Sequence, residues 1–472
     1  MAEAPVGERT FGDPLSFGDI GNRNPIESLR THNRVDPYWG GLWDRSTAAG
    51  WQTFRRAQRM IASTSMRMPD YMDADPELSC EAVVNRRNRE RTLDALGVLD
   101  NWRTVTAEQL AAFTSRTRIA SGRSTQMREM FGASLVDIGE FANGLLSRSN
   151  EGARLYRPTP GDAFEKVVRP SITYPEWVSV TCGTPYSTGR QFDKHNVIAS
   201  EFALRVAEFT DAALVLGEKM ATHELLAYTS IGRDLPDRLF QRSGDLVIVR
   251  EDGARIVIEV TTSRGAALGE KIDRWAQILG DRRMSRSGLS VIFLTVDVPD
   301  TPKARSFSLR NGVMRYLRSS VAKFPGVSFD RTAERIGVAD WREWFPEPGK
   351  VSPDFLALVC DVANGEPASP WSRKAFLDIF DLEFSPEEPE RFSAIFDNAS
   401  MLRSVPKWMR TGTAPDLTGV MHARSEYAGM DLRSLQRERN ENQERWFSAP
   451  VPPRRLRSNG PTMMYPKETT HV

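Results

Sequence analysis

Two carboxylates on neighbouring β-strands constrain the fold of this chain more than any other feature of its sequence. Residues 246–249 read Leu-Val-Ile-Val, residues 256–258 read Ile-Val-Ile, and Gly253 lies in the turn between them. Such runs around a glycine turn predict a β-hairpin. Asp245 stands at the head of the first strand and Glu259 lies within the second. Two acids on adjacent strands are common ligands of Mg²⁺, so the hairpin is either a metal site or a surface hairpin with ordinary exposed acids.

The segments on either side of the hairpin predict an α/β domain over residues 191–345. Amphipathic helices are indicated by apolar residues on one stripe, as at Leu268, Ile272 and Leu279. The continuous apolar run from Leu289 is typical of a strand buried within a sheet. The expected order is a helix over 195–209, a strand over 212–216, the hairpin, a helix over 268–279, a strand over 289–296 and a helix over 305–321. This order predicts a mixed sheet between helices.

Residues 81–160 have the order of a winged helix-turn-helix, a module that places a basic helix in a DNA groove. A charged helix over 81–99 precedes Thr106, which is a good N-cap for a second helix. Residues 121–131 would form or lead into the recognition helix, and residues 150–152 would turn a β-wing. The arginines expected to contact phosphates and bases are Arg116, Arg118, Arg123 and Arg128, with Arg148 and Arg154 on the wing. The same order of helices also occurs in proteins that do not touch DNA.

The remaining segments complete the predicted domain organisation. Asp44 would begin a helix in which Trp51, Phe54 and Ile61 are buried. Serine-proline pairs such as the one at Ser352 are typical of helix starts and predict a helical C-terminal extension. The expected parts are an N-terminal arm with the aromatic and arginine-rich helix (1–80), the winged helix (81–160), a connector (161–190), the α/β domain (191–345), a small helical domain (346–400), and a charged helix with a disordered tail (401–472).

Composition narrows the class of protein. The 472 residues carry a net charge of +1, so a nucleic-acid surface would have to be local. The three cysteines, Cys80, Cys182 and Cys360, are far apart, and the five histidines form no metal-binding spacing. This pattern argues against a disulfide scaffold or a zinc site and fits a reducing compartment. We find no apolar run long enough to span a membrane and no signal peptide, so we expect a cytoplasmic protein.

Around the hairpin, the sequence resembles the PD-(D/E)xK nuclease superfamily. That superfamily has an αβββαβ core, with an acid at the head of one strand and a (D/E)xK motif on the next. Asp245 matches the first acid, with Gly244 where proline is usual. Glu259 matches the second acid, and Thr261 stands where the lysine is usual. The resemblance implies a restriction-endonuclease-like fold for residues 191–345.

Together with the preceding winged helix, residues 85–340 more specifically resemble the replication-relaxation family of actinobacterial plasmids and mobile elements. Proteins of that family pair a winged helix with a degenerate nuclease-like domain. His195, at the start of a long helix, matches their pattern. So do Glu259-Val260 and the later Lys271-Ile272 with an aromatic residue, here Trp275.

The nuclease resemblance implies a catalytic set of Glu201, Asp245, Glu259 and Lys271. Asp245 and Glu259 would hold Mg²⁺, which stabilises the phosphate transition state and activates a water. Glu201 would be the third carboxylate. Lys271 would supply the cation that is missing because Thr261 occupies the lysine position of the motif.

Three functions follow as hypotheses. The favoured one is a double-stranded DNA-binding protein of a plasmid, phage or integrative element, involved in replication or DNA relaxation and transfer, with a degenerate nuclease-like domain. Its partners would be DNA and either a second copy of the chain or replication and transfer proteins. The second is a Mg²⁺-dependent DNA endonuclease. The third is an assembly protein with no role on DNA, which would use the helical tail as a partner surface.

Overall fold

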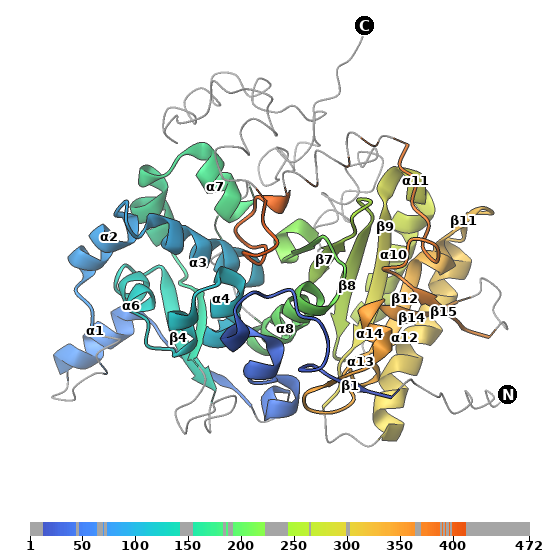
Figure 1. Cartoon of the computed structure of the whole chain (residues 1–472), viewed down its shortest axis with the longest axis horizontal. Coiled ribbons are helices and arrows are strands. Elements are labelled where there is room, and N and C mark those ends of the chain that lie inside the picture. The colour runs from blue at the N-terminus through green and yellow to red at the C-terminus, as the bar shows by residue number, and fades with distance from the viewer. Residues whose placement is uncertain are drawn as a thin grey trace, which may run out of the picture.

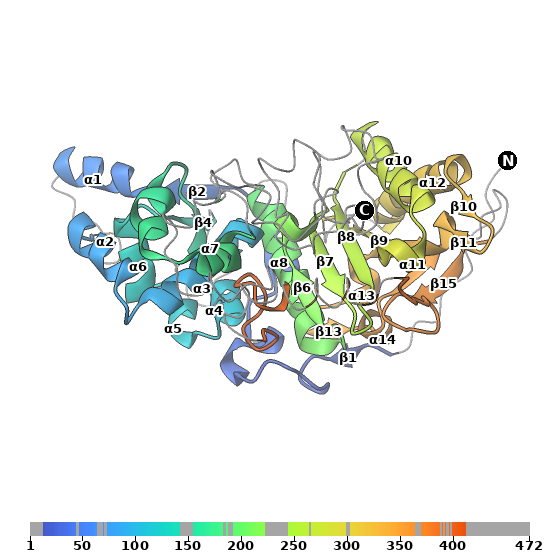
Figure 2. The same ribbon diagram turned by 90° about the horizontal axis from the view of Figure 1, so that it is seen from above.

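The computed structural model describes residues 13–43, 47–63, 69, 73–141, 154–182, 186, 192–221, 244–263, 266–298, 303–363, 370–387, 389, 392, 396 and 399–411. The two largest sheets lie side by side within these residues, and helix α8 (Asp193–Phe209) runs between them (Figures 1 and 2). No helix among the described residues is long and apolar enough to cross a membrane.

The larger sheet has seven strands in the order β15-β14-β12-β9-β8-β7-β6. Strands β6, β7 and β8 form an antiparallel meander, β9 is parallel to β8, and β12 is parallel to β9. Strands β14 and β15 extend the far edge in antiparallel fashion. The expected α/β class with a mixed sheet is therefore confirmed. The strands are β6 (Leu214–Leu216), β7 (Leu246–Val249), β8 (Arg255–Thr261), β9 (Leu289–Thr295), β12 (Ile336–Asp340), β14 (Val359–Val362) and β15 (Ser372–Ala375).

The hairpin of β7 and β8 forms as the sequence predicts. Gly253 adopts a φ of 88°, which a residue with a side chain rarely tolerates, and its N–H donates to Arg250 O over 3.0 Å. Every residue of β7 and β8 is buried. A strand covered on both faces explains why the sequence reads as a continuous apolar run and not as a clean alternation.

Helices α8, α10 (Ala266–Asp281) and α12 (Lys303–Lys323) surround this sheet. Helices α10 and α12 pack on each other where Gly269 meets Tyr316, and both contact β9. The ring of Phe202 on α8 stacks on Trp344 with centroids 5.6 Å apart. Helix α8 therefore packs on the segment that follows β12. The shorter elements here are η7 (Glu218–Ala221), α11 (Met284–Ser287), β10 (Gly326–Val327), β11 (Asp330–Arg331), η10 (Thr332–Arg335), α13 (Trp341–Trp344) and α14 (Pro353–Leu356).

The smaller sheet has four strands in the order β2-β4-β5-β3, all antiparallel. Helix α4 starts with a capping box in which Thr106 and Gln109 satisfy each other's backbone N–H groups, so the predicted N-cap is confirmed. The elements are β2 (Ala49–Gln52), α1 (Phe54–Ser63), α2 (Pro76–Val84), α3 (Arg89–Trp102), β3 (Val105–Thr106), α4 (Ala107–Thr114), α5 (Thr117–Ala120), α6 (Thr125–Gly132), β4 (Val136–Phe141) and β5 (Arg154–Pro158).

Several expectations about the flanking segments were wrong. Residues 49–52 form strand β2, so the helix expected from Asp44 begins only at Phe54, and Ile61 is exposed.

Part of the expected N-terminal arm is packed, because β1 (Leu15–Ser16) pairs with β13 (Lys350–Val351). The arm continues as helical turns η1 (Glu27–Leu29), η2 (Thr31–Asn33) and η3 (Tyr38–Leu42). The connector contains η5 (Phe164–Val168), η6 (Arg169–Ser171) and α7 (Tyr174–Thr181), which packs on α3.

The expected small helical domain over 346–400 is also wrong. Its strands β14 and β15 belong to the seven-stranded sheet, where Cys360 and Val362 of β14 are buried, at 2% and 3% exposure. The serine-proline signal correctly located the start of α14, where Ser352 accepts from Asp354 N. That helix has only 4 residues. The charged helix expected near the C-terminus lies outside the described residues.

Candidate functional site

Asp245 is held at the head of β7 by three hydrogen bonds. Its N–H donates to Ile258 O over 3.0 Å, so the backbone joins the ladder with β8. Its Oδ2 accepts from the N–H of Val260 over 2.7 Å. Its Oδ1 lies 2.8 Å from Nε2 of His195, the third residue of α8. Asp245 is therefore fixed in orientation by the neighbouring strand, and α8 delivers an imidazole to it.

Glu259 lies within β8 and its carboxylate is buried. Oε2 accepts from Nζ of Lys271 over 2.6 Å, and Oε1 accepts from Nε1 of Trp275 over 2.5 Å. Lys271 and Trp275 are four residues apart on α10, so they lie on one face of that helix and reach the same carboxylate. The side chain of Lys271 remains about one-third exposed, whereas that of Glu259 is 1% exposed. The ion pair of Lys271 and Glu259 therefore extends from the buried sheet to the protein surface.

The electrostatics couple these four groups. Burial opposes the charge of His195, but the charge of Asp245 and its hydrogen bond outweigh that effect and raise the pKa of His195 above 6.5. Burial raises the pKa of Glu259, against the opposing charge of Lys271. Burial disfavours the charge of Lys271, but Glu259 and then Asp245 outweigh it and raise the pKa of Lys271. We name His195, Asp245, Glu259 and Lys271 the acid–base cluster.

Thr261 and Gly244 are the two departures from the nuclease pattern, and both have a physical explanation here. Thr261 is buried, at 5% exposure, and the cation comes instead from Lys271 on α10. A Cβ atom on Gly244 would lie 2.4 Å from Cγ1 of Val257. Proline carries such an atom, so the close approach of β8 excludes it.

Glu201 does not join the acid–base cluster, which corrects the expected third carboxylate. Its Oε1 accepts from Nη2 of Arg34 over 3.2 Å and from Nε of Arg205 over 3.3 Å, and its Oε2 accepts from Nε2 of Gln109 over 3.2 Å. Six residues separate it from His195, which amounts to about 240° around a helix. The two side chains therefore leave α8 in different directions, and the histidine takes the place beside Asp245.

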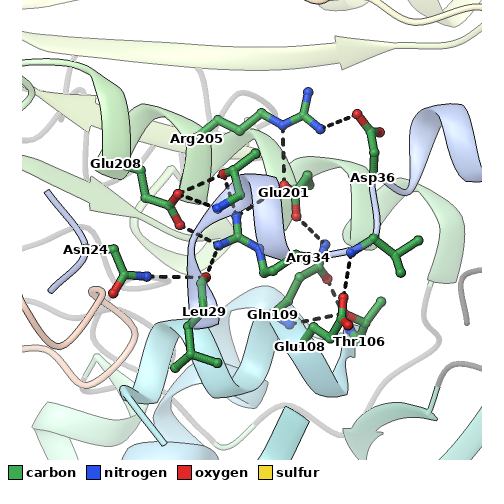
Figure 3. A network of polar contacts seen from close by, with 12 residues as sticks. Asn24, Leu29, Arg34, Asp36, Thr106, Glu108, Gln109, Glu201, Arg205 and Glu208 are labelled. Carbon is green, nitrogen blue, oxygen red and sulfur yellow. Dashed lines mark hydrogen bonds and ion pairs between the residues drawn. The ribbon is translucent and has the colours of Figure 1, made fainter. Parts of the chain in front are cut away.

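Glu201 belongs instead to a buried charge network that connects three parts of the chain (Figure 3). Arg34, from the N-terminal arm, lies between Glu201 and Glu208 of α8 and pairs with both. Nη2 of Arg205 donates to Asp36 Oδ2 over 2.7 Å. Burial opposes the charge of Arg34, but Glu201 and Glu208 outweigh it and raise its pKa. Since Gln109 comes from α4, this network attaches α8 to the four-stranded unit.

The residues present do not form a Mg²⁺ site in this arrangement. Each oxygen of Asp245 and Glu259 already accepts a hydrogen bond, and one bond to Glu259 comes from the ammonium of Lys271. Within the part of the chain that the structure describes, no group of three histidine, cysteine, aspartate or glutamate side chains could hold a metal. In the acid–base cluster each acid is paired with a basic side chain. These pairs compensate the negative charge that a metal ion would compensate on unpaired carboxylates.

The arginines expected to bind DNA have varied surroundings. Arg118 and Arg123 are exposed, one on α5 and the other just before α6. Arg128 is exposed on α6, where its Nε donates to Asp73 O over 3.0 Å. Arg116 is only partly exposed and lies before α5, 3.7 Å from Asp94. The last two are Arg154, which pairs with Glu140 on the neighbouring strand, and Arg148, which lies outside the described residues.

Sequence reasoning missed the roles of two residues at this site, Trp275, which donates to Glu259, and His195. The sequence signal for Trp275 was its spacing of four residues from Lys271 on a predicted helix. His195 gave no such signal, since 50 residues separate it from Asp245.

No protein-family model, curated protein or solved structure matches the chain. The fold and the cluster define an α/β protein with a smaller helix-and-strand unit attached.

Proposed function

We propose that this chain is a double-stranded DNA-binding protein of a plasmid, phage or integrative element. The observation that carries the proposal is the order of elements from α3 to β5. Helix α3 is followed by β3, α4, α5, α6, β4 and β5, and β3 pairs with β5 instead of with β4. This order and pairing support the assignment of a winged helix, with α5 as one extra helical turn. In that module α6 would be the recognition helix.

The surface of α6 supports this role. Its C-terminal end is covered, because a Cβ on Gly132 would lie 2.2 Å from Oγ of Ser79 on α2. Its N-terminal half remains accessible, with Thr125 and Arg128 exposed. Recognition helices contact base edges mainly through their N-terminal residues. Arg118 and Arg123 precede this end and would contact phosphates.

The seven-stranded unit would serve as a degenerate nuclease-like domain that adds DNA or partner contacts. The order α8, β6, β7, β8, α10 and β9 agrees with an αβββαβ core. Asp245 and Glu259 would occupy the positions of the two acids, with Thr261 in place of the usual lysine. The cluster is already charge-compensated, which favours a structural or binding role over catalysis.

The test is equilibrium binding of the full chain to a short DNA duplex, followed by fluorescence anisotropy at increasing salt. A protein that neutralises several phosphates loses affinity linearly on a log–log plot, with a slope of about −0.9 per phosphate. A slope steeper than about −3 is expected. Absent or salt-insensitive binding would contradict the proposal and favour an assembly role without DNA.

The 2.6 Å contact between Lys271 and Glu259 favours one second candidate, phosphodiester cleavage. Lys271 lies on α10 and not at the lysine position of the nuclease motif, yet it still reaches the second acid. Such a cation can stabilise the negative charge that develops during cleavage.

Incubation of supercoiled plasmid with the full chain decides this candidate. Reactions would contain Mg²⁺, Mn²⁺ or a chelator. Cleavage that Lys271→Ala and Asp245→Asn abolish, while both variants keep the circular dichroism of the wild type, would establish a nuclease. Plasmid that stays intact under all conditions would exclude cleavage, and DNA binding would remain as the proposed function.

A further inference from the structure

Four cations surround one buried carboxylate on the four-stranded unit. Arg403 and Arg410 each place Nη1 2.8 Å from Oδ1 of Asp94 on α3. On the other oxygen, Nζ of Lys407 lies 3.5 Å away and Nη2 of Arg116 lies 3.7 Å away. We name Arg116, Arg403, Lys407 and Arg410 the basic cluster. Three of its members come from a segment far along the chain, over residues 399–411 (Figure 1).

That segment is packed firmly, so the cations have fixed places. Leu402 and Val405 are fully buried. The N–H of Arg403 donates to Ser179 O over 2.7 Å, and the N–H of Lys407 donates to Phe113 O over 2.8 Å. Trp102 on α3 donates from Nε1 to Ser404 O over 2.8 Å. The segment therefore belongs to the four-stranded unit and extends its surface.

The basic cluster carries more positive charge than its acids neutralise. Burial opposes ionisation of Asp94, but Arg410 and then Arg403 outweigh it and hold the pKa of Asp94 at about 2. Asp94 is therefore charged at neutral pH. Glu90 lies 2.9 Å from Nη2 of Arg403 and supplies a second negative charge. Four cations thus face two acids.

The excess charge is accessible to an anion. The side chain of Lys407 is 46% exposed and that of Arg116 is 30% exposed. Burial lowers the pKa of Arg116, the charge of Asp94 opposes this, and Arg91 and Arg410 lower it further. An anion would relieve that repulsion.

The basic cluster lies beside the helix assigned to DNA recognition. Arg116 directly precedes α5, which leads to α6. Nε2 of Gln126, on the first turn of α6, donates to the carbonyl of Arg91 over 2.7 Å. That bond holds the N-terminus of α6 against α3 near Arg91, whose charge acts on Arg116. A duplex docked on the N-terminal half of α6 would bring its phosphates near this surface.

We propose that the C-terminal segment 399–411 completes the DNA-binding surface, with Lys407 and Arg116 contacting backbone phosphates next to the site of α6. The inference rests on the proposed function. Its ligand is the sugar–phosphate backbone, so these contacts are independent of sequence. An acidic protein partner is the competing occupant, and the experiment separates the two.

The substitution Lys407→Gln tests this inference in the full chain. It removes an exposed charge, and the backbone hydrogen bond to Phe113 O does not need the side chain. Loss of one phosphate contact lowers the salt slope by about 0.9 and raises Kd about five- to tenfold near 0.1 M salt, equally for unrelated duplexes. The matched control is Lys323→Gln on α12, an exposed lysine paired with Asp273, which should leave Kd and slope unchanged.

A direct readout accompanies the affinities. Duplex DNA should protect the amine of Lys407 from an amine-reactive label and leave Lys323 reactive. If the wild type binds DNA but Lys407→Gln keeps the same Kd and slope, the inference fails while the proposed function stands. If the wild type binds no duplex, both fail, and labelling protection by an acidic polypeptide would identify the competing occupant.

Discussion

Nζ of Lys271 lies 2.6 Å from Oε2 of Glu259, so α10 supplies the cation that β8 lacks. Glu259 is buried, and removal of its partner leaves an uncompensated charge in the sheet. The substitution Lys271→Met should lower the free energy of unfolding by about 1–3 kcal/mol, less than the loss for a fully buried pair because Lys271 is partly exposed. Urea denaturation measures this. The double variant Glu259→Gln/Lys271→Met should recover part of the loss, and a double variant no more stable than the single one would contradict the pairing.

His195 should make stability depend on pH. Its pKa is raised in the folded state, so its contribution is fully present below about pH 6.5 and is lost as pH rises through the folded pKa. Asp245 has a lowered pKa, with the effect of burial outweighed by His195, so its contribution disappears only as pH falls below its usual range. The stability difference between wild type and His195→Gln should therefore be larger near pH ~6 than near pH ~9. A difference that is constant or grows with pH would show that the imidazole is not bound to Asp245.

Arg34 should be essential for attachment of the N-terminal arm. It is buried between Glu201 and Glu208, and its loss leaves two acids without this partner. We expect Arg34→Met to lower the free energy of unfolding by about 3–5 kcal/mol. The control is Arg30→Met on the same arm, a partly exposed residue paired with exposed Glu27, which should cost about 1 kcal/mol or less. Equal effects of the two substitutions would contradict the assigned role.

The sequence predicted most of the sheet around the hairpin, because those segments are long, apolar and bounded by turn residues. The predicted helix and strand at 268–279 and 289–296 are α10 and β9 with nearly the same bounds. Strands β14 and β15 escaped prediction because each has only 4 residues, and β14 also pairs with β12, which lies earlier in the chain. Strand β2 was mistaken for helix for a similar reason: its pairing with β4 spans about ninety residues.

The candidate site was predicted in part. Asp245, Glu259 and Lys271 were expected together and do lie together, since strand register and helix spacing are local properties. The pairing of His195 with Asp245 depends on how α8 is rotated about its axis. The sequence predicts the spacing of side chains along α8 but not which face of the helix lies against the sheet. Glu201 was misplaced for the same reason. The basic cluster joins α3 to a segment about 310 residues later, which no local pattern connects.

Binding of the full chain to duplex DNA by the wild type and by Arg118→Gln/Arg123→Gln tests the central claim most directly. Both arginines are exposed at the approach to α6, and the thermal unfolding midpoint of each protein checks that the double variant is folded. The account predicts that the wild type binds with a steep salt dependence and that the double variant binds at least tenfold more weakly, with a slope reduced by about two. A wild type that binds no duplex, or a double variant with the affinity and slope of the wild type, would contradict it.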